Sequence, residues 1–294
     1  TTYPEADHRS MMAYHAEGLA NGADVHPQIT CLPLTIQLRM DNPYYFRTVP
    51  IFLELLGRPV EEFASVYRDP AWRAEAARQA PDVKPPVIWH RFIVSETRAN
   101  PQLIGRDVAS IARERNCTEI DVLCDLSLAD DLETHFTVTL SNYEDGPVID
   151  LMRQPGAVFG QSDAGAHVAQ LCDANMPTEL LARWVRDKGA FTVEEAVHKL
   201  TAELASIYGI TDRGVLRPGA AADVVVLDLD ELDPGPLTRV RDLPGDEERL
   251  IADRPRGIEH VLVNGTPITA HGESLVATMR ERPGRMLRAG GSDR

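Results

Sequence analysis

A short loop after an apolar run carries the residue types best suited to acid–base chemistry in this sequence. Residues 157–159 read Ala-Val-Phe and predict a buried strand, and residues 160–168 follow as Gly-Gln-Ser-Asp-Ala-Gly-Ala-His-Val. The small residues allow a sharp turn that leaves Asp163 at the carboxyl end of the strand. Because α/β barrels keep their catalytic groups at that end, Asp163 is the candidate general acid or base. A turn former or a helix N-cap is the structural alternative.

Four other polar side chains are candidates for contact with a substrate. Ser162 directly precedes the aspartate, and His167 lies four residues beyond it. His26 belongs to a second apolar strand, predicted at residues 24–31, from which it could point toward the same rim. Arg91 could bind a substrate carboxylate through two parallel hydrogen bonds. Ser162 could instead be a turn-forming serine, His167 a helix-start histidine packed against the loop, and Arg91 a solvated surface arginine.

The elements that position these side chains are predicted from apolar periodicity. Thr192 with Glu195 forms a capping-box pattern at the start of one expected helix. Before the last third of the chain, strands are expected only at residues 24–31, 87–94 and 157–160. Helices or amphipathic stretches are expected at residues 7–21, 47–56, 60–68, 70–79, 105–115, 119–131, 178–188 and 193–208.

The last third of the chain has the pattern of a small β unit. Residues 212–228 place two glycine-bearing turns around short β-prone runs, and three alanines lead into the run Asp-Val-Val-Val-Leu-Asp. Residues 257–268 contain Asn264 and Gly265 between two apolar runs, which is a strong signal for a two-residue hairpin. The sequence Glu-Arg-Pro-Gly-Arg-Met-Leu-Arg follows at residues 281–288.

Taken together and in this order, the motifs resemble the amidohydrolase superfamily, and within it the branch of D-aminoacylase and the N-acyl-D-amino-acid deacylases. The likeness extends from about residue 20 to residue 288. It implies an α/β fold: the carboxyl-terminal part of a metal-dependent (β/α)8 barrel at residues 1–210, with an inserted excursion at about 40–150. A small β-sandwich portion would occupy residues 211–294.

The resemblance also implies that much of the barrel is built from residues outside this sequence. A whole (β/α)8 barrel takes about 250 residues and eight strand–helix units. Residues 24–31 and 157–160 would correspond to its seventh and eighth strands. The first six strands are therefore expected in an amino-terminal half, as a separate chain or a lost segment.

A zinc centre of one or two ions is the cofactor that the resemblance implies. Zinc lowers the pKa of bound water and polarises the scissile carbonyl. The nine histidines show no His-x-His pair and no other metal-ligand spacing. Asp163 is thus expected to be the chain's own metal ligand and general acid/base, with the remaining ligands held elsewhere. The expected reaction is hydrolysis of a nonpeptide C–N amide bond, such as that of a small N-acyl-D-amino acid.

Composition narrows the range of partners and compartments. The formal net charge is −15, which disfavours nucleic acids and anionic membrane surfaces. No apolar run reaches the roughly 20 residues of a membrane span, and no secretory signal is recognisable. Four cysteines without Cys-x-x-Cys spacing favour a cytoplasmic protein. Open strand edges of a partial barrel predict completion by a partner, and an oligomer is expected.

Three alternatives remain open at the level of sequence. The chain could be a noncatalytic interaction module that keeps the fold without the metal. Residues 160–164 nearly match the Gly-x-Ser-x-Gly nucleophile elbow, which would make Ser162 the nucleophile of an α/β-hydrolase. Thr1 could act as an amino-terminal nucleophile exposed by processing.

Overall fold

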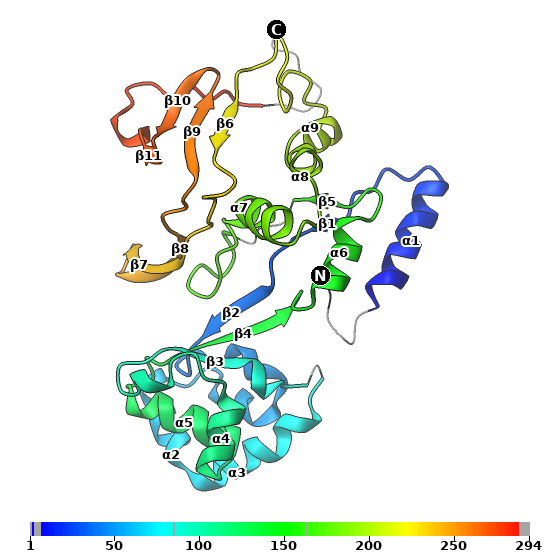
Figure 1. Cartoon of the computed structure of the whole chain (residues 1–294). Helices are drawn as coiled ribbons and strands as arrows, with labels where there is room; N and C mark the ends of the chain where they lie inside the picture. Colours follow the sequence, from blue (N-terminus) through cyan, green and yellow to red (C-terminus); the bar gives the residue numbers. More distant parts are fainter. Residues whose placement is uncertain (1, 3–6, 85, 161, 163, 288–294) are drawn as a thin grey trace. The chain divides into compact units, whose positions relative to one another are not determined.

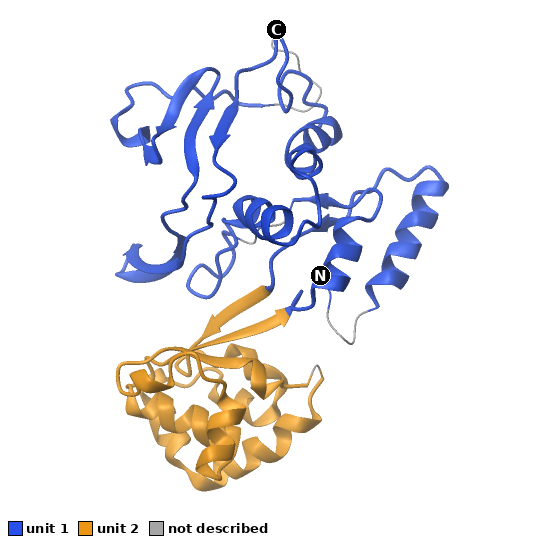
Figure 2. Cartoon of the chain, viewed as in Figure 1, with its two compact units in different colours: residues 1–33, 141–294 blue, residues 34–140 orange. Residues whose placement is uncertain are grey.

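The computed structural model describes residue 2 and residues 7–84, 86–160, 162 and 164–287. The chain divides into two compact units, one of residues 1–33 with 141–294 and one of residues 34–140 (Figure 2). The second unit overlaps most of the excursion expected at residues 40–150. The boundary expected between residues 210 and 211 stays a prediction.

The elements follow one another along the chain as a mixture of helices and strands, so the α/β fold class is confirmed (Figure 1). The α-helices are α1 His8–Ala20, α2 Phe63–Arg68, α3 Pro70–Gln79, α4 Val108–Arg115, α5 Glu119–Ala129, α6 Asp145–Met152, α7 Met176–Glu179, α8 Val193–Leu200 and α9 Ala202–Ile207, and a π-helix at Leu180–Asp187 continues α7. The strands are β1 Gln28–Ile29, β2 Leu34–Leu38, β3 Phe92–Glu96, β4 His135–Ser141, β5 Val158–Phe159, β6 Val224–Leu227, β7 Leu237–Leu243, β8 Glu247–Ala252, β9 Ile258–Val263, β10 Thr266–Ala270 and β11 Glu273–Ser274. Short 3-10 helices lie at Tyr44–Thr48, Pro50–Leu55, Val60–Glu62, Ala80–Asp82, Trp89–Arg91, Pro101–Leu103 and Val276–Thr278.

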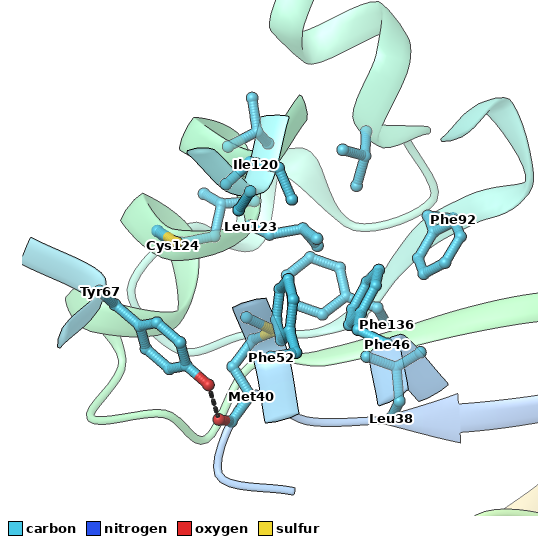
Figure 3. Close-up of a cluster of buried hydrophobic side chains, with 14 of the residues drawn as sticks. Leu38, Met40, Phe46, Phe52, Tyr67, Phe92, Ile120, Leu123, Cys124 and Phe136 are labelled. Carbon is cyan, nitrogen blue, oxygen red and sulfur yellow. Dashed lines mark hydrogen bonds between the residues drawn. The ribbon is translucent and has the colours of Figure 1, made fainter. Parts of the chain in front are cut away.

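Residues 34–140 fold around a three-stranded sheet in the order β2-β4-β3 and the helices α2 to α5. Their core gathers aromatic side chains, among them Phe46, Phe92 and Phe136, each fully buried (Figure 3). The Tyr67 hydroxyl is also buried, and it donates a hydrogen bond of 2.7 Å to the Met40 carbonyl. This bond satisfies a polar group that would otherwise be costly to bury.

The other unit contains the two strands expected near the candidate site. Strands β1 and β5 are hydrogen-bonded neighbours and run parallel, with Gln28 opposite Val158 and Ile29 opposite Phe159. The helices α6, α7 and α8 and the π-helix contribute side chains to the core around these strands. The Trp184 indole lies in this core and donates to the Cys31 carbonyl at 3.1 Å, tying the π-helix to the end of β1.

The last third of the chain forms a four-stranded antiparallel sheet in the order β11-β10-β9-β6 and a separate hairpin of β7 and β8. Asn264 and Gly265 connect β9 to β10 with φ values of 47° and 78°, as a two-residue hairpin requires. The hairpin predicted at residues 257–268 is therefore confirmed. The hairpin of β7 and β8 was not predicted from the sequence.

Two expectations about strands were wrong. The strand expected at residues 87–94 begins at Phe92, because Trp89–Arg91 form a 3-10 turn. Strands β2 and β4 were not expected at all. They pair across about a hundred residues of sequence, where Thr35 and Thr139 hydroxyls lie 3.1 Å apart, and local patterns carry no information on such pairing.

Candidate functional site

The candidate site begins at the carboxyl ends of β1 and β5. Because the two strands are parallel neighbours, the segments that leave them start at the same edge of the sheet. Val158 and Phe159 are both buried, which fixes the end of β5 in the core. The loop that follows β5 is the one on which sequence analysis placed the catalytic aspartate.

Gly160 lies close to the Gln28 side chain at this edge. A Cβ atom at this position would lie 3.1 Å from the Gln28 side-chain carboxamide carbon. A larger residue would require the exposed Gln28 side chain to shift by a few tenths of an ångström. Gln28 therefore lies directly beside the start of the loop, although sequence analysis assigned it no role. Its position next to Pro27 in an expected strand was the only available signal.

Asp163 lies outside the described residues, so its assignment as catalytic residue and metal ligand stays a prediction. Ser162 is described and half-buried. Residues 164–170 form turns and bends, and the next helix, α7, begins only at Met176. The alternative in which the aspartate caps a helix that starts directly after it is therefore wrong, because those residues form no helix to cap.

His167 shapes this loop through its backbone. Its φ of 47° is in the left-handed region, which histidine tolerates better than most residues other than glycine. Its carbonyl accepts hydrogen bonds from the amides of Gln170 at 2.7 Å and Leu171 at 3.2 Å. The side chain is exposed. The expectation that His167 contacts substrate stays a prediction.

The hairpin of β7 and β8 holds the far end of the loop. The Leu250 amide donates to the Val168 carbonyl at 2.8 Å, and Arg239 Nη1 donates to the Ala169 carbonyl at 3.2 Å. Arg239 also bonds Glu248 at 2.8 Å, and both side chains are nearly buried. This support was not predicted, although the Pro-Gly turn between two β-prone runs was a usable signal.

His26 precedes β1 and is half-buried. Its Nε2 atom lies 3.0 Å from Asp24 Oδ1, and the Asp24 side chain is almost fully exposed. Its Nδ1 atom is buried and has no hydrogen-bond partner within the part of the chain that the structure describes. The sequence-based role of His26 as a substrate contact is not decided by this geometry and stays a prediction.

Arg91 belongs to the other unit. It ends the 3-10 turn Trp89–Arg91, and its amide donates to the Ile88 carbonyl at 2.9 Å. Burial raises the pKa of the neighbouring Tyr45 phenol, and the positive charge of Arg91 offsets part of that effect. Its expected role as a carboxylate clamp remains a prediction.

Metal ligands do not gather elsewhere in the described residues. In the part of the chain that the structure describes, no group of three His, Cys, Asp or Glu side chains is arranged to hold an ion. The described residues by themselves therefore do not fit a zinc centre. Within the same residues, no helix is both long and apolar enough to cross a membrane.

A hollow of about 520 Å³ lies on the unit of residues 34–140. Its lining consists of Arg68, Pro70, Arg73, Ala74, Thr118, Asp121, Asp125 and Leu128. Arg73 is already bonded to Asp125 at 2.8 Å and to the Tyr67 carbonyl at 2.5 Å. This hollow contains none of the side chains that sequence analysis selected, and its charged groups largely satisfy one another.

Comparison with known proteins identifies the class of the chain. A sequence profile of the amidohydrolase family matches residues 107–269, which is more than half of the chain. The chain belongs to the amidohydrolase family.

Its relatives narrow the likeness to one branch. An N-acyl-D-glutamate deacylase of Alcaligenes xylosoxydans is 40% identical over 115 residues, 38% of this chain and 20% of that protein. A D-aminoacylase of the same organism is 31% identical over 180 residues, 60% of this chain and 34% of that protein. A solved D-aminoacylase variant in complex with copper chloride shares the fold, with a TM-score of 0.51 at 19% identity, covering 95% of this chain and 46% of that one. The chain thus spans less than half the length of each of these proteins.

Proposed function

We propose that this chain is the carboxyl-terminal part of a metal-dependent amidohydrolase that hydrolyses a nonpeptide C–N amide bond, such as that of an N-acyl-D-amino acid. The observation that carries the proposal is the parallel pair of β1 and β5 with the loop of residues 160–168 at its carboxyl end. Membership of the amidohydrolase family and the identity of 40% to an N-acyl-D-glutamate deacylase support it.

In this proposal Asp163 acts as general base and then as general acid. Its carboxylate accepts a proton from the water that attacks the amide carbonyl carbon. It returns a proton to the nitrogen as the C–N bond breaks, which releases a carboxylic acid and an amine. A positioned acid–base group of this kind contributes typically about 10²–10⁴-fold to the rate.

The proposed cofactor is zinc, one or two ions, which when bound lowers the pKa of water and polarises the carbonyl. Because the described residues contain no cluster of metal ligands, we assign the ligands other than Asp163 to an amino-terminal part of the enzyme. That part would be a separate chain or a further segment. In the complete enzyme Ser162, His167, His26 and Arg91 would contact the substrate, with Arg91 binding its carboxylate.

The test compares the purified chain with its complex with the amino-terminal part. Zinc content and hydrolysis of N-acetyl-D-glutamate, N-acetyl-D-methionine and their L-enantiomers are measured for both. We expect zinc and D-selective deacylation in the complex only. Asp163→Asn should lower kcat of the complex by about 10²–10⁴-fold, and the matched control Asp246→Asn, at a hairpin turn where the side chain is 83% exposed, should not.

Other outcomes would overturn the proposal. A complex that is metal-free and inactive would favour the interaction module. Complete inactivation by Ser162→Ala, with chelators harmless, would favour a serine hydrolase, and the same result for Thr1→Ala would favour an amino-terminal nucleophile.

A further inference from the structure

The far end of the loop after β5 is held by a hairpin that is distant in sequence. The Val168 carbonyl accepts the Leu250 amide of β8 at 2.8 Å. The Ala169 carbonyl accepts a hydrogen bond from Arg239 Nη1 of β7 at 3.2 Å, across 70 residues of sequence. The carbonyl just before them, that of His167, is bonded within the loop. Three consecutive carbonyls are therefore satisfied, and the hairpin supplies the donors for two of them.

The hairpin brings these two donors to the same place. Leu250 and Arg239 are directly opposite each other, so their side chains lie on one face. Because the Leu250 amide bonds to Val168, outside the hairpin, this pair exchanges no backbone bonds between β7 and β8. The Leu250 side chain is buried. Val168 thus lies against the outer edge of β8, directly opposite the point where Arg239 leaves β7.

The Arg239 guanidinium has a second partner in Glu248. Its Nη1 atom, the same nitrogen that donates to the Ala169 carbonyl, also donates to Glu248 Oε1 at 2.8 Å. The other carboxylate oxygen accepts from Arg241 Nη2 at 3.2 Å. The side chains of Arg239 and Glu248 are only 14% and 11% exposed. A carboxylate with both oxygens bonded fixes the direction of the Arg239 nitrogen, and charge-assisted bonds of this kind are the stronger ones.

Stability alone does not explain this nearly buried charged pair. Removing two charges from water costs on the order of several kcal/mol, and two apolar side chains in the same place are often as stabilising. An apolar pair, however, has no donor for the Ala169 carbonyl. Arg239 and Glu248 thus supply what packing cannot, which is a donor with a fixed direction at the end of the loop.

The near end of the loop is fixed by β5. Phe159 is buried and pairs with Ile29 of β1. Residues 160–166 therefore run between a buried strand and an anchored turn, and they include Ser162 and the proposed acid–base residue, Asp163. Fixing a short segment at both ends removes much of its conformational freedom. An acid–base group needs such restraint, because a displacement of about 1 Å at a reacting group can cost about 100-fold in rate.

We propose that Arg239, oriented by Glu248, is a positioning residue for the proposed amide hydrolysis. Together with the Leu250 amide it fixes the far end of the loop that carries Asp163, so it acts through the loop and not through the substrate. The proposal rests on the proposed function for the reaction itself, whereas the anchoring of the loop is a property of this chain alone.

Hydrogen exchange on the chain alone tests the anchoring. Arg239→Met keeps a long aliphatic side chain and removes its donors. The Gln170 amide, which bonds to the His167 carbonyl, and the Leu250 amide should then exchange about tenfold faster or more. The Ile251 amide faces β7 inside the hairpin, so its exchange reports whether the hairpin stays folded.

Arg249→Met is the matched control. Arg249 lies on the opposite face of the hairpin and bonds to Asp242 at 2.7 Å, so its loss should leave the loop amides unchanged. Unchanged exchange in Arg239→Met, or equal acceleration in both variants, would overturn the anchoring. If Arg239→Met opens the hairpin itself, Arg239→Lys takes its place. Its ammonium keeps the charge beside Glu248 but is one bond shorter, so only the loop amides should exchange faster, and unchanged loop amides would again overturn the anchoring.

Kinetics of the complex with the amino-terminal part test the positioning role. Arg239→Met should lower kcat for N-acetyl-D-glutamate by about 10–100-fold with KM nearly unchanged, and Arg249→Met should change neither. In a complex that carries Asp163→Asn, adding Arg239→Met should lower kcat no further, because the loop then has no carboxylate to position. A raised KM with unchanged kcat would show that Arg239 contacts the substrate, and a further loss in the double variant would show that it acts by another route. Either result would overturn the positioning role.

The two proposals can fail separately. Faster exchange of the loop amides in Arg239→Met, together with a complex that has no deacylase activity, would keep the anchor and refute the function. An active deacylase complex with the same kcat in Arg239→Met would keep the function and refute the positioning role.

Discussion

Two buried tryptophans differ in whether the indole nitrogen has a partner. The Trp184 indole donates to the Cys31 carbonyl at 3.1 Å, whereas Trp72 Nε1 is buried with no acceptor among the described residues. A buried acceptor that loses its donor costs about 1–3 kcal/mol. Removing an unpaired donor carries no such cost.

We therefore expect Trp184→Phe to lower the free energy of unfolding more than Trp72→Phe, by about 1–3 kcal/mol. Both changes keep an aromatic ring and remove the same atoms, although the Trp184 ring centroid also lies 5.2 Å from Arg183 Cζ and 5.2 Å from Lys188 Nζ. Urea denaturation followed by circular dichroism measures the difference. Equal losses would mean that the bond to the Cys31 carbonyl contributes nothing to stability.

The thiols of Cys31 and Cys124 should resist alkylation in the folded chain. Both side chains are fully buried, and burial raises the pKa of each to about 12. At pH 8 only about one such thiol in ten thousand is ionised, and the thiolate is the reactive form. Cys117, which is only half-buried, should be labelled first. Iodoacetamide labelling with mass spectrometry gives the order in which the cysteines react. The differences between them should disappear in denaturant. Rapid labelling of Cys31 in the folded chain would contradict the burial.

At the scale of single residues, the sequence indicated the loop but not its supports. The strand before the loop could be predicted because small residues follow an apolar run, and the roles of the polar side chains in the loop stay predictions. The roles of Arg239 and Gln28 could not be predicted, because each lies on a strand that is distant from the loop in sequence. Local patterns contain no information on such contacts.

At the scale of elements, helix α8 begins with a capping box that stabilises its first turn. Thr192 Oγ1 accepts the Glu195 amide at 3.2 Å, and the Glu195 carboxylate accepts the Thr192 amide at 2.8 Å. Thr192→Ala removes one of these bonds and should lower the free energy of unfolding by about 0.5–2 kcal/mol. Thr192→Ser keeps the hydroxyl and should cost less. Thermal denaturation compares the two, and equal shifts in Tm would show that the cap is not stabilising.

This capping box is an element that the sequence predicted and the structure confirmed. Helix α1, expected at residues 7–21, is confirmed at His8–Ala20 for the same reason, because local periodicity and caps determine it. The strands were predicted less completely than the helices. Strands β1 and β5 were expected because apolar runs mark residues 24–31 and 157–160, and only the resemblance implied that they are neighbours in a barrel, whereas β2 and β4 have mixed, half-buried patterns. Their pairing is long-range, so it could be established only from the structure.

At the scale of the whole molecule, each compact unit has its own core. The cluster in residues 34–140 runs from Leu38 to Val138, and the second cluster takes its residues from the remaining chain. The two ends of the 34–140 unit are close, since the Thr35 and Thr139 hydroxyls are 3.1 Å apart. An inserted unit with its own core and adjacent ends has the properties of an independent domain.

We expect residues 34–140, produced alone, to fold cooperatively, because excision removes none of the contacts within their core. A domain of this size should unfold with a free energy of about 5 kcal/mol or more. Urea denaturation monitored by near-ultraviolet circular dichroism and by tryptophan fluorescence should give coincident transitions. A fragment of residues 34–96 is the matched control, since it keeps β2 and β3 but lacks β4, α4 and α5 and should remain unfolded. The contrary result would be that residues 34–140 lose their near-ultraviolet signal while keeping helical content. That result would mean that their core needs the rest of the chain and that this unit is not stable on its own.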